Sequence, residues 1–544
     1  MMSDIRNNRN QIFLVAVNVF LVFFLIVLSN LQIVPMRIGD FVFFAILTLA
    51  LALYRPGWVF LFFVGTIMLE NINLAPVSLG VAIRPYQFFG GMTILALIIR
   101  LLTKRLNFKL TKLIWQDYLV LAMGMASFLS VMNSQNKGTG LKQSVVLVSF
   151  MALYFLARNF LQTIADMKKI VPFFLSSSVV VVGYGIWQNI RFAHNLSNFE
   201  VMPGRPNATF AEADWLGIFL SFLLAMLYSW IFYINKKEEA SFEDAQNPKS
   251  KFQSSNQIQN SKFKKLLTAT HWLLIVLVFT LLILTVSRSA WLGALAVTFI
   301  FLFSVFTRLK VQPKNWQWME TIKLKMCVII ALAISIALVY FFQLTTFQLG
   351  NRAQSTGTGL QKITVACPGS MDVLIPQTVA SEDEYLRYGC RQINLEEIEG
   401  EKIKGSYVNE IYRKDPNVSI RSEIYKKSWE LIKAHPILGI GWGSISAYLG
   451  KDARGAGLNA SNIFLEIWLG AGIFGLIAFV ALLIIIMTRA LHNFAQDDAE
   501  MKSVGLFILL GLVAIVVPNL FNSGIMLGFL WLFLGASFIV KAKK

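Results

Sequence analysis

RSEIYKKSWELIKAHPILGIGWG, at residues 421–443, is followed by NASNIFLEIWLGAGIFGL, at residues 459–476, and these two stretches decide how the second half of the chain folds. The first has apolar side chains at helical spacing and charged ones opposite, which is typical of a helix at a membrane surface. Pro436 ends this helix, and the glycines after it allow a tight turn or a close backbone approach. The second stretch begins a long apolar span. The positions concerned are Ile424, Tyr425, Trp429 and Ile432 in the helix and Gly439, Gly441 and Gly443 in the turn.

Composition places most of the chain in lipid. Of 544 residues, 56% are hydrophobic and 15% charged, and the long apolar runs exclude a soluble globular protein. A hydrocarbon core roughly 30 Å thick needs about 20 apolar residues per helix, so the runs predict an all-α membrane protein with about 14 (12–14) transmembrane helices. The predicted spans are 12–30, 39–54, 57–75, 85–102, 117–133, 143–162, 170–189, 214–234, 270–286, 290–307, 326–344, 461–488, 504–521 and 523–540. The span 57–75 contains Glu70, so a partly re-entrant segment is the alternative there.

The basic excess is an orientation signal. Lys and Arg number 49 against 30 Asp and Glu, and the basic clusters occupy alternate loops and both chain ends. By the positive-inside rule these clusters are cytoplasmic, which predicts cytoplasmic N- and C-termini. We interpret the basic residues as setting the orientation of the helices and contacting anionic membrane lipids, and we predict no nucleic-acid partner.

Two polar insertions divide the chain. One is poor in apolar residues and predicts a disordered cytoplasmic linker. The other exceeds a hundred residues, too long for a structureless connection, and its β-prone pieces at 362–365 and 372–375 predict a small extracytoplasmic cap. The predicted division is 1–234 N-terminal transmembrane helices, 235–268 linker, 269–344 transmembrane helices, 345–460 extracytoplasmic loop domain with the surface helix, and 461–544 C-terminal transmembrane helices.

Two cysteines, Cys367 and Cys390, lie in the predicted cap. Outside the cytoplasm such a pair can oxidise and stabilise a loop with little core of its own. We therefore predict a disulfide, with two free thiols as the alternative. Their spacing, without a His pair or a CxxC, does not indicate a metal site.

Four arginines are predicted on the external face of the membrane: Arg84, Arg205, Arg288 and Arg421. Guanidinium groups bind phosphate with forked geometry, so several together suit a diphosphate-bearing lipid. The alternative is that each arginine only contacts lipid headgroups. Arg288 lies in a very short turn between two apolar spans, which restricts its position.

Three stretches resemble motifs of the O-antigen ligase and O-antigen polymerase family: RPNATFAEADWLGIFL at 205–220, LTVSRSAWLGALAV at 284–297, and the block from Arg421 to Gly475. The resemblance implies a multi-pass enzyme of the bacterial cytoplasmic (inner) membrane, an inverting, metal-independent glycosyltransferase without a cofactor. Its substrates would be an undecaprenyl-diphosphate-linked glycan and a glycan or glycolipid acceptor. Arg205, Arg288 and Arg421 correspond to arginines that hold the carrier diphosphate and stabilise its departing charge. We add Arg84, Trp429 and Gly441 as candidate substrate-binding residues.

The chain departs from the ligase pattern at one position. Ligases place a His before Asn462, where this chain has Ser461, and serine is a poor general base at neutral pH. We favour Glu466 as a catalytic residue, because it could face the helical bundle near the start of a span. The other candidate bases are Glu212, Asp214, His435 and His194.

The sequence thus predicts transfer or polymerisation of lipid-linked oligosaccharide outside the cytoplasm, and the missing histidine favours a polymerase over a ligase. One alternative is a polysaccharide flippase or exporter, although such architectures favour repeated halves and polar groups within midmembrane helices. Another is an inactive scaffold, which the serine at 461 would suit. Other envelope polysaccharide assembly proteins are possible partners under each reading.

Overall fold

The structure is a computed structural model of the whole chain. The residues that it describes are 8–106, 110–194, 196–197, 199–202, 204–245, 254–307, 318–344, 359–368, 376–393, 397–414, 416–451, 455 and 457–539.

The chain is a polytopic membrane protein. Within the described ranges, nine helices are long and apolar enough to cross a membrane. Shorter apolar helices complete the bundle: α2 (Ile38–Tyr54), α3 (Pro56–Thr66) and the apolar part of α9 (Ser254–Leu284). The long helices are α1 (Asn8–Asn30), α4 (Pro85–Leu102), α6 (Lys137–Phe160), α7 (Ile164–Ala193), α8 (Ala213–Ala245), α10 (Arg288–Thr307), α11 (Trp318–Phe341), α17 (Ile463–Ala495) and α18 (Ala499–Asn519), and α5 (Trp115–Ser130) packs among them.

Two predicted spans are shorter in the structure. The span 57–75 is helical only to Thr66, because Asn73 then accepts hydrogen bonds from the backbone N–H groups of Ala75 and Ile83 and fixes a non-helical loop. The span 523–540 contains a short 3-10 turn, η7 (Gly524–Met526), and a nine-residue helix, α19 (Gly528–Ala536). Hydropathy alone predicted full helices, but both segments are buried inside the protein, where they need not cross the bilayer.

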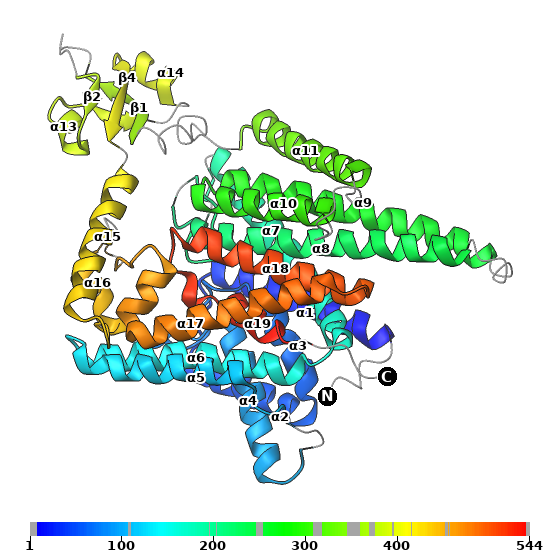
Figure 1. Cartoon of the computed structure of the whole chain (residues 1–544). Coiled ribbons are helices and arrows are strands. Elements are labelled where there is room, and N and C mark those ends of the chain that lie inside the picture. Colours follow the sequence, from blue (N-terminus) through cyan, green and yellow to red (C-terminus); the bar gives the residue numbers. More distant parts are fainter. Residues whose placement is uncertain are drawn as a thin grey trace.

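Helical structure extends into the predicted cytoplasmic linker from both sides. Helix α8 continues to Ala245 and α9 begins at Ser254, and residues 246–253 lie outside the described residues. The α8–α9 hairpin therefore projects from one end of the bundle (Figure 1).

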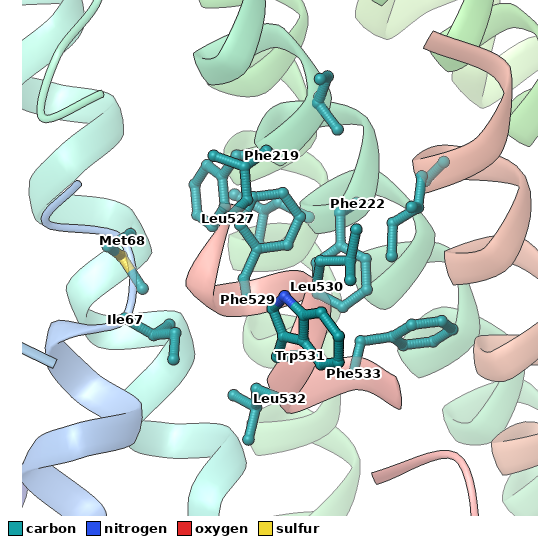
Figure 2. Close-up of a cluster of buried hydrophobic side chains, with 14 of the residues drawn as sticks. Ile67, Met68, Phe219, Phe222, Leu527, Phe529, Leu530, Trp531, Leu532 and Phe533 are labelled. Atoms are coloured by element: carbon teal, nitrogen blue, oxygen red, sulfur yellow. The ribbon is translucent and has the colours of Figure 1, made fainter. Parts of the chain in front are cut away.

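The core of the bundle is aromatic where α8 meets α18 and α19. Phe222 of α8 packs against Phe529 and Phe533 of α19, with ring centroids 5.4 Å apart in both pairs. Phe219 also contacts Phe529, and Trp531 is fully buried beside them (Figure 2). Such well-buried aromatic pairs stabilise the arrangement beyond their area burial. This core fixes the segment that joins α18 to α19.

The cap is a small mixed sheet of order β2-β4-β1-β3 at the end of the bundle opposite the α8–α9 hairpin (Figure 1). Strand β1 pairs antiparallel with β3 and β4, while β2 is parallel to β4. A disulfide joins Cys367 to Cys390 beside a core that includes Val365 and Ile411. Strand β1 contains the predicted piece 362–365, whereas 372–375 lies outside the described residues. The elements are β1 (Leu360–Cys367), β2 (Thr378–Val379), α13 (Glu382–Leu386), β3 (Arg391–Ile393), α14 (Glu397–Ile403) and β4 (Tyr407–Lys414).

The predicted surface helix is α15 (Pro416–Ala434), which lies between the cap and the bundle (Figure 1). The glycine turn after it approaches α17 closely: the backbone N–H of Ile440 donates to the Leu469 carbonyl at 2.8 Å. Helix α17 breaks at Gly472, whose φ of 67° disfavours other residues. A Cβ there would also lie 2.0 Å from the Ile437 carbonyl oxygen. The turn, η6 (Trp442–Ser444) and α16 (Ile445–Leu449) thereby hold the first turns of α17 in place.

Candidate functional site

The first motif is fixed to the second through Arg205. Arg205 lies in the loop between α7 and α8, and its Nε donates to the Thr285 carbonyl at 3.1 Å. Its Nη2 lies 3.3 Å from Asp214 Oδ1 in the first turn of α8. Because Thr285 begins the turn between α9 and α10, this loop and that hairpin are held together. Asp214, one of the candidate bases, is engaged in an ion pair with Arg205.

The α9–α10 turn positions Arg288. Helix α9 ends at Leu284 and α10 begins at Arg288, so only three residues separate the helices. Val286 has a φ of 51°, and the Trp291 indole N–H donates to the Leu282 carbonyl at 2.8 Å. Arg288 is half-buried at the first position of its helix. The turn thus has little freedom, as the sequence predicted.

The second motif is joined to the third through the end of α18. The Asn522 side-chain amide donates to Ser289 Oγ at 2.9 Å. Two residues earlier, the Leu520 carbonyl accepts from Asn462 Nδ2 at 3.0 Å and from the Tyr425 hydroxyl at 3.3 Å. We call the set formed by Arg205, Thr285, Ser289, Asn522, Leu520, Asn462 and Tyr425 the motif bridge.

Arg421 lies one helical turn before Tyr425 on α15. Burial raises the pKa of Tyr425, and the positive charge of Arg421 opposes that rise, which places the guanidinium near the phenol. The Tyr425 hydroxyl also lies 3.1 Å from the Ser461 carbonyl. Arg421 is therefore brought to the same part of the bundle as the motif bridge.

The start of α17 presents Ser461 and Asn462. Asn462 is the N-cap residue, and its Oδ1 accepts from the backbone N–H groups of Phe464 and Leu465. Ser461 has a φ of 49°, which is unusual for a residue with a side chain. Glu466 is buried one turn further on, and its Oε2 accepts from the Ala460 N–H at 2.6 Å. Ser461 and Glu466 therefore lie close to Asn462, which belongs to the motif bridge.

Three other predicted residues have different surroundings. Gly441 has a φ of 81°, and a Cβ there would lie 3.2 Å from both the Ser130 carbonyl oxygen and Ser134 Cβ. Trp429 lies on the exposed side of α15 and contacts Trp468 edge to face. Arg84 is the N-cap residue of α4, and its Nε lies 3.0 Å from Glu70 Oε2.

Sequence reasoning missed the polar groups that connect the motifs. Asn522, Ser289 and the Leu520 carbonyl were not predicted, and Tyr425 was predicted only as part of an apolar face. The signal for Asn522 was weak: it is one of two asparagines in PNLFNSG, where a span ends. Of the remaining candidate bases, His194 is exposed after α7 and His435 follows α15.

Residues 273–480 match the family model described as O-antigen ligase. These residues are an O-antigen ligase family domain. The resemblance predicted from the motifs is thereby confirmed, and the match covers Arg288, Arg421 and Ser461 but begins after Arg205. The matched domain supports a glycosyltransferase-like membrane enzyme with lipid-linked glycan substrates. No curated protein matches the chain.

Proposed function

We propose that this protein transfers or polymerises an undecaprenyl-diphosphate-linked oligosaccharide on the extracytoplasmic face of the bacterial cytoplasmic membrane. The observation that carries the proposal is the motif bridge. It links three motifs that are distant in sequence, and two of them belong to the O-antigen ligase domain.

In the proposed reaction the arginines bind the diphosphate of the donor. The acceptor hydroxyl oxygen forms a bond to the anomeric carbon, and the bond from that carbon to the diphosphate oxygen breaks with inversion. Negative charge grows on the leaving diphosphate, and fixed guanidinium groups such as those of Arg288 and Arg421 stabilise it. Arg205, held by Asp214 and the Thr285 carbonyl, keeps a fixed orientation for the same task. This chemistry needs positive charge at the leaving group, which the arginines supply without a metal.

The acceptor proton needs a base other than Ser461. Glu466 is the proposed acceptor of this proton, because its carboxyl is buried near the start of α17, close to Ser461. Asp214 is a weaker candidate, since its carboxylate already pairs with the Arg205 guanidinium at 3.3 Å. Substituting Glu466 with Gln, which keeps its shape, should reduce transfer while leaving donor binding intact.

The test is glycan display in cells that lack the gene. The deletion strain is complemented with wild type, Arg288→Ala, or the control Arg37→Ala, an exposed arginine that precedes α2. If the protein polymerises, the deletion strain should lose long glycan chains and accumulate single lipid-linked units. Wild type and Arg37→Ala should restore the long chains, and Arg288→Ala should not. Long chains that remain on the carrier would indicate ligation. An unchanged glycan profile in every strain would contradict the proposed enzyme.

A further inference from the structure

A polar cavity of about 300 Å³ lies beside the loop that carries Arg205. It is bordered by the end of α1, the loop after α3, α7 and residues 199–202 and 204–209. Its size is at the lower end of small-molecule sites, roughly 300–1,000 Å³, but such sites are mostly apolar and this one is not. The polar side chains that line it include Asn30, Gln32, Asn71, Tyr184, Glu200 and Thr209.

The walls of this cavity are held by buried hydrogen bonds. Gln188, fully buried on α7, donates to the Phe199 carbonyl and accepts from the Ala208 N–H at 2.7 Å. The Asn71 N–H donates to the Thr209 carbonyl at 2.8 Å. The cavity therefore exists before a ligand arrives, which lowers the entropic cost of binding.

The lining offers hydrogen-bond donors and acceptors in planar groups. The Tyr184 hydroxyl donates to Asn30 Oδ1 at 2.7 Å, which leaves the amide hydrogens of Asn30 as donors. Glu200 Oε2 accepts from the Gly204 N–H at 2.7 Å. Burial raises the pKa of Glu200 to about 7, so near neutral pH its carboxyl group occurs in both donating and accepting forms. The Asn30 amide and the Glu200 carboxyl can therefore form hydrogen bonds to neighbouring hydroxyl groups of one ligand.

An aromatic wall borders these polar groups. Trp187 stacks on Phe199, which lines the cavity, with ring centroids 6.0 Å apart, and also stacks on Tyr184 at 5.7 Å. A ring with hydroxyls at its edge and apolar faces would satisfy both surfaces. An alkyl chain would leave the polar groups without hydrogen bonds, which is costly, and an anion would be repelled by ionised Glu200.

We infer that this cavity is a saccharide subsite, which binds one sugar unit of the donor or acceptor glycan while Arg205, Arg288 and Arg421 hold the diphosphate. The inference rests on the proposed function and names the part of the substrate that this region recognises. The 199–209 loop connects the two regions, because the Gly204 N–H binds Glu200 and the next residue is Arg205.

The test measures binding of a free glycan to the purified full-length protein by saturation-transfer NMR. The probe is the oligosaccharide released by mild acid from the carrier lipid that accumulates in the deletion strain. Asn71→Ala and Glu200→Ala should each raise its Kd about fivefold or more, since each loses a hydrogen bond to the sugar. The matched control is Gln135→Ala, an exposed amide at the same end of the bundle.

A second arm separates the subsite from the transfer site. Arg288→Ala should bind the free glycan like wild type although it no longer transfers it. If an acceptor glycan fragment displaces the bound probe, the cavity binds the acceptor. If the fragment does not displace the probe, the cavity binds the donor. Unchanged Kd values in both cavity variants, or no binding by wild type at millimolar glycan, would overturn the subsite. If Arg288→Ala still transfers in cells, the proposed function fails while the binding result stands.

Discussion

Arg84 and Arg288 stand at the start of α4 and α10, yet their surroundings differ. Arg84 pairs with Glu70, which is only 3% exposed and also accepts from the Tyr86 hydroxyl and the Gly528 N–H. Arg288 lies close to Thr285, whose carbonyl accepts from Arg205 of the first motif, and next to Ser289, which accepts from Asn522 at the end of α18. We call the first group, formed by Glu70, Arg84, Tyr86 and Gly528, the Glu70 cluster.

The difference shows that an arginine at the start of a membrane helix has no fixed role. In the Glu70 cluster a buried carboxylate neutralises the cation and ties the loop after α3 to α4 and α19. Arg288 lies next to two members of the motif bridge, Ser289 and, across the turn, Thr285, and we propose that it binds the donor diphosphate with Arg421. We therefore assign stability to the Glu70 cluster and chemistry to the motif bridge.

The largest effect is expected at the Glu70 cluster. Glu70→Ala removes the carboxylate that pairs with Arg84 and accepts from the Gly528 N–H. This loss should lower the free energy of unfolding by about 3–5 kcal/mol. The unfolding midpoint in detergent, followed by tryptophan fluorescence, measures this cost. The control Glu423→Ala changes an exposed glutamate of α15 and should leave the midpoint unchanged. An unchanged unfolding midpoint for Glu70→Ala would contradict the claim that the Glu70 cluster stabilises the fold.

The next effect concerns Arg288. Arg288→Ala should reduce the rate of glycan transfer by about 10²–10³, as loss of one charge-stabilising donor typically does, with little change in the unfolding midpoint. Arg288→Lys should be intermediate, because it keeps the charge but loses the forked geometry. Rates are measured as release of undecaprenyl diphosphate from purified donor. A loss of stability equal to that of Arg84→Ala would show that the two arginines do not differ.

The sequence predicted the parts of the site but not their connections. Arg288 could be placed because two apolar spans are separated by only a few residues, and the amphipathic pattern located α15. The bond from Arg205 to the Thr285 carbonyl joins residues 80 apart and depends on tertiary packing. Hydropathy could not show that α3 and α19 are short, because a buried segment and a membrane span have similar apolar composition.

A smaller effect is expected at the start of α17. Asn462→Ala removes the N-cap of α17 and the hydrogen bond to Leu520, which should destabilise the protein by about 1–2 kcal/mol. The serine of Asn462→Ser can still cap the helix, but its side chain is too short to reach the Leu520 carbonyl. Transfer reduced in both variants, with stability lost mainly in Asn462→Ala, would separate the two roles. Equal transfer by Asn462→Ser and wild type would exclude the Leu520 bond from the site.

The smallest effect is a pH dependence at Glu200. Its pKa is about 7 when folded against an ordinary value of 4.5, so the folded protein holds a proton that the unfolded chain loses. Wild-type stability should therefore fall as pH rises from about 4.5 to 7, by less than about 1 kcal/mol because the group is partly solvated. Glu200→Gln should lack this fall in unfolding midpoints measured between pH 4.5 and 8. A parallel pH dependence in both proteins would contradict the assignment.

The central claim is that Arg205 and Arg288 act in one site, and a double-mutant cycle tests it most directly. Undecaprenyl diphosphate release is measured for wild type, Arg205→Lys, Arg288→Lys and the double variant, because lysine substitutions should keep rates measurable. Residues that hold one diphosphate together should be non-additive, with the double variant losing little more than the worse single variant. Losses that multiply would mean that the two arginines act independently and would contradict the account.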